Sequence, residues 1–448
     1  MDLRLLPFIS VIYLLYLLDR SNVGNARIAG LQKDTHMTNT QFSIALTVTL
    51  IPYILIEIPT NLLLKIVGPD RLIPSLLVLW GIVTTLQGLV RNFHDLLACR
   101  FLLGLFEGGI FPAIILYLSS FYPRQRLQLR VAIFFSAASL SGAFGGLLAF
   151  GIINMDGIGG KAGWAWLFIL EGLFSVIFGL VSLYFLPRSV ESASFLTPTE
   201  KEGILAQLTH EGTMNDKSDV FSWAQVGQAF LLPQVWFVAT IFFFAGIVLG
   251  SLSYFTPSIL VALGFSASRA QLMSVPPFAA SFVVTVSVSL LSDKYGLRAP
   301  SAIFSSILCI IGFSMYLGSL NPRVQYGSLF FSLSGIYCSG PSLATWISNN
   351  AAPQTRRATA IAIGFIMTNV GAIIALWLFS TWSKPPRYTT GTIVLLVSAC
   401  MMAALSLGNF LYLRAQNKNK ARVRLLGGTQ ENEASDIGDR SAWFIYTL

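Results

Sequence analysis

Two ionisable residues interrupt an apolar stretch that runs from about residue 96 to residue 118. Arg100 and Glu107 are seven residues apart in this stretch. Seven residues make nearly two turns of an α-helix, so both side chains would project from one face, roughly 10 Å apart along the axis. Ionisable groups are expensive in hydrocarbon and normally face a bundle interior or a water-filled pathway. The pair predicts an ion or substrate pathway, with a structural ion pair as the alternative, and Gly104 and Gly108 predict close approach of a neighbouring helix.

A second charged pair, Asp19 and Arg20, directly follows the apolar run 3–18. Arginine remains charged in a low dielectric, and its planar fork can hold a carboxylate through two hydrogen bonds. Arg20 is therefore the first candidate for binding an organic anion. Adjacent helical residues point about 100° apart, so we expect Asp19 and Arg20 to contact different partners. A permanent structural unit of the two is the alternative.

Proton coupling needs a carboxyl group whose charge changes as the protein changes shape. Burial disfavours the charged form of a carboxyl group, whereas a nearby arginine favours it. Glu107, two turns from Arg100, would alternate between burial and contact with an arginine as the cavity opens to either side. It is therefore the leading candidate for a proton carrier, with Asp19 second. Glu57 and Glu171 are two further acidic residues in apolar segments, and we interpret Glu171 as structural.

The composition is that of an integral membrane protein. Of the 448 residues, 54% are hydrophobic and 11% are charged, and the mean hydropathy is +0.69, whereas a soluble protein carries roughly 25% charged residues. The net charge of +9 lies in short loops, which indicates membrane topology rather than a nucleic-acid partner. The four cysteines and three histidines are scattered, so we expect no metal site and no cofactor. No nucleophile–base set or phosphate-binding loop supports an enzyme.

Apolar segments of membrane-spanning length divide the chain into two sets of six. We expect an all-α protein with a first bundle at 1–187, a central linker with an amphipathic helix at 188–232, a second bundle at 233–414 and a tail at 415–448. The expected spans lie at about 3–24, 42–67, 72–91, 96–120, 129–153, 164–187, 233–262, 270–292, 298–319, 324–346, 355–382 and 389–414.

The distribution of Lys and Arg among the loops places both termini and the linker in the cytoplasm. In the linker, Thr199-Glu-Lys-Glu202 has the form of a capping box that would open a short helix through Leu208. Residues 221–231 would form the amphipathic helix. We expect the tail to be disordered or loosely docked.

An internal repeat supports the two halves, because the loop at 61–71 has a counterpart at 289–298. Two related halves with the substrate between them is a common transporter design. The second copy resembles the signature loop of the major facilitator superfamily, Gly-x-x-x-Asp-Arg/Lys-x-Gly-x-Arg/Lys. It keeps Asp293, Lys294, Gly296 and Arg298, with Ser289 at the first glycine, whereas the first copy has Asn61 and Lys65 in place of the glycine and the aspartate. The resemblance implies a gating role for these residues, and Glu57 is the candidate for the missing acid.

Further motifs resemble the anion:cation symporter family, and more closely its fungal branch of allantoate, nicotinate and other vitamin or carboxylate permeases. The chain departs from this branch at Ala165, where arginine is usual. The motifs are Leu17-Leu-Asp19-Arg20-Ser-Asn22-Val-Gly24-Asn25-Ala26, Ile56-Glu57-Ile-Pro59-Thr-Asn61, Met155-Asp156-Gly157 and Trp166-Leu-Phe-Ile-Leu-Glu171-Gly172.

This resemblance implies proton-coupled uptake of a small organic anion at the plasma membrane, with Asp19, Arg20, Arg100 and Glu107 at the positions for coupling and anion binding. Tyr254, Asn350 and Asn369 in the second half are candidates for contacts to the rest of the substrate. We expect a monomer whose partners are the anion, protons and the bilayer. The alternatives are a uniporter or exporter of the same fold, or a nutrient sensor with little flux.

Overall fold

The computed structural model describes residues 2–123, 127–135, 141, 145, 148, 151–152, 155–210, 222–265, 267–378, 383, 387–425 and 435–448. These residues form helices and no strand. The first half contains α1 (Asp2–Ile28), α2 (Leu31–Asp34), α3 (Asn39–Val67), α4 (Pro69–Gln87), α5 (Phe93–Glu107), α6 (Ile110–Ser119), α7 (Leu127–Phe135) and α9 (Gly163–Phe185). The linker contains α10 (Pro198–His210) and α11 (Trp223–Phe230). The second half contains α12 (Pro233–Ala262), α13 (Ala267–Tyr295), α14 (Ala299–Gly318), α15 (Pro322–Asn349), α16 (Gln354–Trp377) and α17 (Thr389–Leu425).

The helices confirm the all-α fold class expected from the apolar segments. Nine helices within the described residues are long and apolar enough to cross a membrane. The helices α1 and α15 are of similar length but are not among the nine: α1 carries Asp19 and Arg20, and α15 is rich in serine. Of the expected span 129–153, the structure describes α7 and a few later residues.

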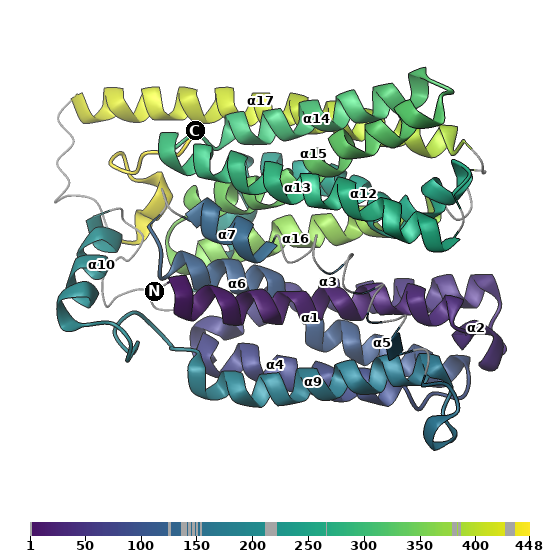
Figure 1. Ribbon diagram of the computed structural model, residues 1–448. Helices are drawn as coiled ribbons and strands as arrows, with labels where there is room; N and C mark the ends of the chain where they lie inside the picture. Colours follow the sequence, from purple (N-terminus) through teal and green to yellow (C-terminus); the bar gives the residue numbers. More distant parts are fainter. Residues whose placement is uncertain are drawn as a thin grey trace.

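The long helices lie roughly side by side in two groups (Figure 1). In that view α12, α13, α14, α15 and α17 form the upper group, and α1, α4, α5 and α9 form the lower group. Both chain termini and α10 lie toward the left end of the bundle, and α2 lies at the opposite end. We call these the proximal end and the distal end.

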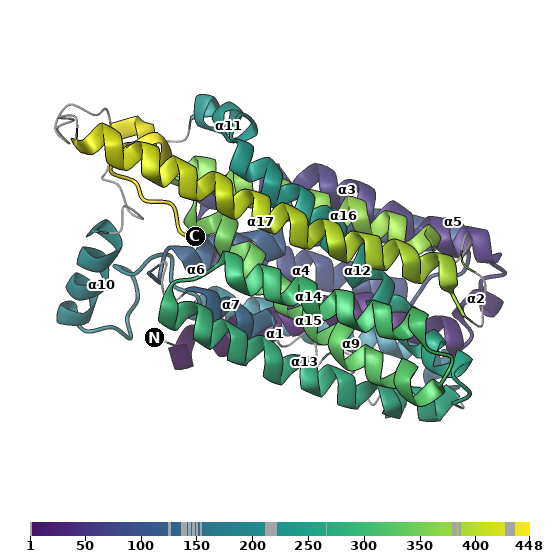
Figure 2. The same cartoon turned by 90° about the horizontal axis from the view of Figure 1, so that it is seen from above.

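The two halves contact each other through α3, α6 and α7. Helices α6 and α7 lie toward the proximal end (Figures 1 and 2). The ring of Phe111 in α6 packs edge-on against Phe365 in α16, with 4.5 Å between ring centroids. Phe135 in α7 lies 6.1 Å from Tyr337 in α15, again measured between ring centroids. Helices α6 and α7 also pack against α15, and α3 packs against α16. The bundle is therefore closed between its halves on the proximal side.

The cap of the linker helix α10 lies two residues before the expected one, and the helix begins at Pro198. Thr197 is the residue that caps it: the Thr197 hydroxyl oxygen accepts from the Glu200 amide at 3.3 Å, and the Glu200 carboxylate accepts from the Thr197 amide at 2.9 Å. Pro198 then occupies the first helical position, where a missing N–H costs nothing. The expected cap at Thr199 was therefore wrong, because the proline that follows Thr197 favours the earlier start.

The tail does not match its expected character. Helix α17 continues to Leu425, so the limit expected at 414 falls inside a helix. Residues 435–448 pack against the second half, where Asp439 and Tyr446 are buried. The expectation of a disordered or loosely docked tail was wrong for both of these stretches, because aromatic and charged side chains within 435–448 find partners on the bundle.

Candidate functional site

The expected fourth span is broken immediately after Glu107. Helix α5 ends at Glu107, and α6 begins at Ile110. Gly109 between them has φ of 83°, the left-handed region that glycine adopts without strain. A Cβ atom at this position would also lie 2.6 Å from Cβ of Thr60. The sequence pattern predicted one continuous helix, and the break places Glu107 at the end of the distal segment instead.

Two glycines let α5 approach α3 closely, as their spacing predicted. A Cβ atom at Gly104 would overlap the carbonyl oxygen of Thr49, and one at Gly108 would overlap the Ile56 side chain. Small residues that allow backbones to approach are the usual basis of helix packing in membranes. This packing fixes α5, and with it Glu107, against α3.

Arg20 on α1 pairs with Glu107 on α5. The Arg20 Nε atom lies 3.7 Å from Glu107 Oε2. The Glu107 side chain is completely enclosed, whereas the Arg20 side chain keeps 27% of its surface accessible. Arg20 is therefore the accessible member of the pair.

Two tyrosines bracket the guanidinium of Arg20. Its Cζ atom lies 4.5 Å from the ring centroid of Tyr16 and 4.9 Å from that of Tyr53. The two phenolic oxygens are 3.1 Å apart and share a hydrogen bond. Tyr16 precedes Arg20 by four residues, so both lie on one face of α1. Cation–π contacts of this kind hold a guanidinium in one orientation.

Asp19 shares Glu107 with its neighbour Arg20 and also interacts with Arg20 itself, but it has further partners of its own. The Thr84 hydroxyl on α4 donates a hydrogen bond of 2.6 Å to Asp19 Oδ2. Asp19 also interacts electrostatically with Arg100 and Glu107. Arg100 is 2% exposed, and its Cζ atom lies 5.9 Å from the ring centroid of Phe168. The four charged residues expected to do chemistry thus converge on one buried region.

A third carboxyl group belongs to this cluster. The Asn22 amide donates a hydrogen bond to the Glu171 carboxylate on α9, and Glu171 interacts electrostatically with Asp19, Glu107 and Arg100. Three carboxyl groups and two guanidinium groups carry a formal charge of minus one if all are ionised. Because net charge is costly in a low dielectric, this arrangement favours a proton on one of the carboxyl groups. We call these five residues, Asp19, Arg20, Arg100, Glu107 and Glu171, the ionic cluster.

The remaining substrate candidates are not brought together. Asn369 on α16 donates to the Phe365 carbonyl at 2.9 Å and lies beside Glu57 of α3, which in turn interacts electrostatically with Arg20. Asn350 is instead engaged by the Thr447 backbone, which accepts at 3.0 Å and donates at 2.7 Å. The structure thus gives Asn350 a partner other than a substrate. The side chain of Tyr254 lies outside the described residues.

The signature loop of the second half joins the two halves at the proximal end. Asp293 Oδ2 accepts a hydrogen bond of 2.8 Å from the Leu129 amide of α7, and Asp293 Oδ1 forms an ion pair of 2.6 Å with Arg298. Gly296 has φ of 66°, which the turn between these residues requires. The Lys294 ammonium lies 5.5 Å from the ring centroid of Tyr295. In the first half, the Lys65 side chain lies outside the described residues.

Several residues of the site were missed from the sequence. Tyr16 had a signal, its four-residue spacing from Arg20. Asn22 also had one, since it belongs to the motif around Asp19 and Arg20, but Thr84 is an ordinary polar residue in a span and nothing in its context marks it. The docking of residues 435–448 was also missed. Within the described residues, no group of three or more His, Cys, Asp or Glu side chains is arranged to hold a metal ion.

A two-part helical bundle with a buried ionic cluster between its spans defines a multi-pass membrane transporter. A model of the Major Facilitator Superfamily matches residues 9–376. The chain is 34% identical over 449 residues to an uncharacterized transporter of Schizosaccharomyces pombe, covering 100% of this chain and 89% of that protein. It is 35% identical over 427 residues to the high-affinity nicotinic acid transporter of Saccharomyces cerevisiae, covering 94% and 79%.

Solved structures of transporters share the fold. The proton:xylose symporter XylE bound to 6-bromo-6-deoxy-D-glucose superposes with a TM-score of 0.71 at 17% identity, covering 91% of this chain and 95% of that one. The human organic anion transporter MFSD10 gives 0.66 at 12% identity, covering 91% and 99%. The chain belongs to the major facilitator superfamily. The resemblance seen in its motifs is confirmed, and its curated relatives include fungal transporters.

Proposed function

We propose that this transporter takes up a small organic carboxylate together with protons, by alternating access to the ionic cluster. The single observation that carries the proposal is the Arg20–Glu107 pair, in which the cation is accessible and the carboxylate is enclosed. The relative named as a nicotinic acid transporter supports a carboxylate substrate. Nicotinate-, pantothenate- and allantoate-like anions are the candidates.

The coupling follows from charge balance at Arg20. A substrate carboxylate that binds the guanidinium replaces Glu107 as its counter-ion. Glu107 is then an enclosed carboxylate without its nearest cation, a state that burial strongly disfavours, so it takes up a proton. One anion and one proton have entered and no net charge has been added. When the substrate leaves, Glu107 loses the proton and pairs with Arg20 again.

The other members of the cluster support this exchange. Asp19, held by Thr84 and close to Arg100, is the second proton-coupling candidate. Arg100 would contribute a second positive charge toward the anion, and Asn369 would contact the substrate from the second half. Glu57, Asp293, Arg298, Lys294, Gly296 and Lys65 are proposed to act in gating, and the proximal contacts between α6, α7 and the second half would form the closed gate.

We further propose that the proximal end faces the cytoplasm of a plasma-membrane protein that acts as a monomer. Lys and Arg concentrate in loops on that side, as the positive-inside rule requires. In this orientation the structure is closed toward the cytoplasm, and an anion would reach Arg20 from outside the cell.

Uptake of a panel of labelled carboxylates tests the proposal. Cells that lack their own permeases would express the wild type or Glu107→Gln, and uptake would be measured at pH 5 and pH 7.5. We expect faster uptake of one compound at pH 5, with the pH dependence abolished by Glu107→Gln. Uptake that ignores both pH and the substitution would indicate a uniporter, and absent uptake despite protein at the surface would indicate export or sensing.

A further inference from the structure

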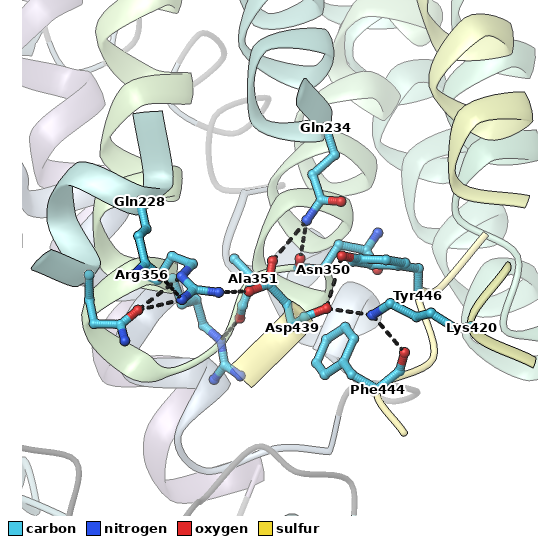
Figure 3. Close-up of polar contacts among 11 residues, drawn as sticks. Gln228, Gln234, Asn350, Ala351, Arg356, Lys420, Asp439, Phe444 and Tyr446 are labelled. Carbon is cyan, nitrogen blue, oxygen red and sulfur yellow. Dashed lines mark hydrogen bonds and ion pairs between the residues drawn. The ribbon is translucent and has the colours of Figure 1, made fainter. Parts of the chain in front are cut away.

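The last described segment of the chain, residues 435–448, is anchored by a buried ion pair. Asp439 pairs with Arg356 near the start of α16, and both side chains are fully enclosed (Figure 3). The Arg356 guanidinium also donates to Gln225 and Gln228 of α11. Two opposite charges removed from water in this way hold each other firmly, since separating them would leave an unpaired buried charge.

Asp439 gathers further bonds from three directions (Figure 3). Gln234 at the start of α12 donates to Asp439 Oδ2 at 3.2 Å. The Asp439 carbonyl oxygen accepts from the Lys420 ammonium of α17 at 2.5 Å and from the Tyr446 hydroxyl at 2.9 Å. Burial raises the pKa of the Tyr446 phenol above its ordinary value, so the hydroxyl remains protonated and able to donate.

The end of the segment is held by backbone contacts. The carbonyl oxygen of Thr447 accepts from the Trp346 indole at 3.2 Å and from the Asn350 amide at 3.0 Å. The carbonyl oxygen of Leu448 accepts from the Arg298 amide at 2.6 Å. The segment therefore touches the proximal ends of five second-half helices, α12, α14, α15, α16 and α17.

The contact with Arg298 connects the segment to the junction of the two halves. The backbone of Arg298 binds Leu448, and its side chain binds Asp293 at 2.6 Å. Asp293 in turn accepts from Leu129, which belongs to the first half, at 2.8 Å. A continuous path of hydrogen bonds thus runs from the terminal segment through Arg298 and Asp293 to the opposite half.

We propose that residues 435–448 form a clasp that positions Arg298, and through it Asp293, and so stabilises the state in which the halves are joined at the proximal end. Opening the proximal side requires the Asp293–Leu129 bond to break. With the clasp docked, Arg298 is fixed from both its backbone and its side chain, and the second-half helix ends move as one body. Release of the clasp frees Arg298 and weakens the junction. This proposal goes beyond the proposed function. It depends on alternating access but not on the identity of the substrate or on proton coupling.

Distance measurements between spin labels test the clasp in the full chain. Labels at the exposed residues Arg71 on α4 and Arg414 on α17 would report the separation of the halves at the proximal end. The more accessible cysteines Cys99 and Cys400 would be replaced by serine, since Cys309 and Cys338 are buried. The variant Asp439→Arg would place a second guanidinium beside that of Arg356, and the repulsion between them would release the clasp. The control Arg440→Glu reverses a charge at the exposed neighbouring residue.

We expect Asp439→Arg to add or enlarge a population with a longer Arg71–Arg414 distance, and Arg440→Glu to match the parent. Asn350→Ala, which removes both bonds to Thr447, should shift the distribution in the same direction and serves if Asp439→Arg does not fold. A label at Trp443 that becomes mobile while the distances stay unchanged would overturn the proposal. These distances need no substrate, so a protein that imports no carboxylate would refute the proposed function while still testing the clasp.

Discussion

Arg20 and Glu107 pair across α1 and α5 with their nearest atoms 3.7 Å apart, and only the arginine is accessible. In the proposed symport, this asymmetry would separate two tasks. The exposed cation would receive the anion, and the enclosed carboxylate would take up a proton when the anion arrives. The tyrosines, whose ring centroids lie 4.5 and 4.9 Å from the guanidinium, would keep it oriented during this exchange.

Replacing Arg20 by lysine should weaken substrate binding although the charge is kept. Lysine lacks the planar fork that can hold a carboxylate by two bonds, and it fits less well between Tyr16 and Tyr53. We expect KM for uptake to rise about tenfold or more, which corresponds to ~1.4 kcal/mol. The exposed Arg4→Lys on the same helix is the matched control. An unchanged KM in Arg20→Lys would rule out a fork-bound carboxylate.

Replacing Thr84 by valine should alter the pH dependence of uptake. The substitution keeps the shape of the side chain but removes the hydrogen bond to Asp19, and a hydrogen bond to a carboxylate favours its charged form. Without it the charged form of Asp19 loses a hydrogen bond, so the pH profile of uptake should change if Asp19 takes part in coupling. Thr85→Val is the control, because the Thr85 hydroxyl donates only to Gly81 within its own helix. Identical profiles for the two variants would exclude Asp19 from coupling.

Replacing Gly109 by alanine should destabilise the break between α5 and α6. An alanine at φ of 83° is strained, at a cost of roughly 1–2 kcal/mol, and its Cβ would press on Thr60 at 2.6 Å. We expect a lower melting temperature of the purified protein together with reduced uptake. Gly203→Ala in α10, where a Cβ atom would meet nothing within 4 Å, should leave both unchanged. A Gly109→Ala protein as stable as the wild type would show that the break is dispensable.

Acid should loosen the start of α10. Hydrogen bonds from the Thr197 amide and hydroxyl lower the pKa of Glu200 below its ordinary value. A carboxyl group whose pKa is lowered by folding contributes stability above its unfolded pKa of about 4.3, and this contribution is lost as the pH falls through the lowered pKa. Hydrogen exchange at the first amides of α10, corrected for the intrinsic rate, should accelerate in acid. Glu200→Gln should remove this pH dependence, and an equal response in both proteins would count against the cap.

The sequence was sufficient for most of the spans in the described part of the chain and for the charged residues, because both depend on composition along one helix. A charged residue within an apolar span costs free energy and is therefore rare. For this reason Asp19, Arg20, Arg100 and Glu107 could be identified before any contact was known. Gly104 and Gly108 were also informative, because a side chain at either position would collide with α3.

What the sequence did not reveal depends on partners from distant segments. The role of Thr84 is visible only when α4 is placed beside α1, where its hydroxyl meets Asp19. The break after Glu107 could be recognised only from the left-handed conformation of Gly109. Asp439 belongs to the tail that the sequence predicted to be disordered or loosely docked. Its burial against Arg356, 83 residues away, follows only when α16 and the terminal segment meet.

The ionic pairing also has a consequence for biogenesis. Arg20 is synthesised 87 residues before Glu107 (107 minus 20), and translation at about 5–20 residues per second separates them by roughly 4 to 17 s. During that interval α1 carries a cation without its eventual counter-ion, and an ionisable residue within an inserting helix is costly. We therefore expect α1 to stay beside the insertion machinery until α5 has been synthesised. The two helices would then enter the lipid together.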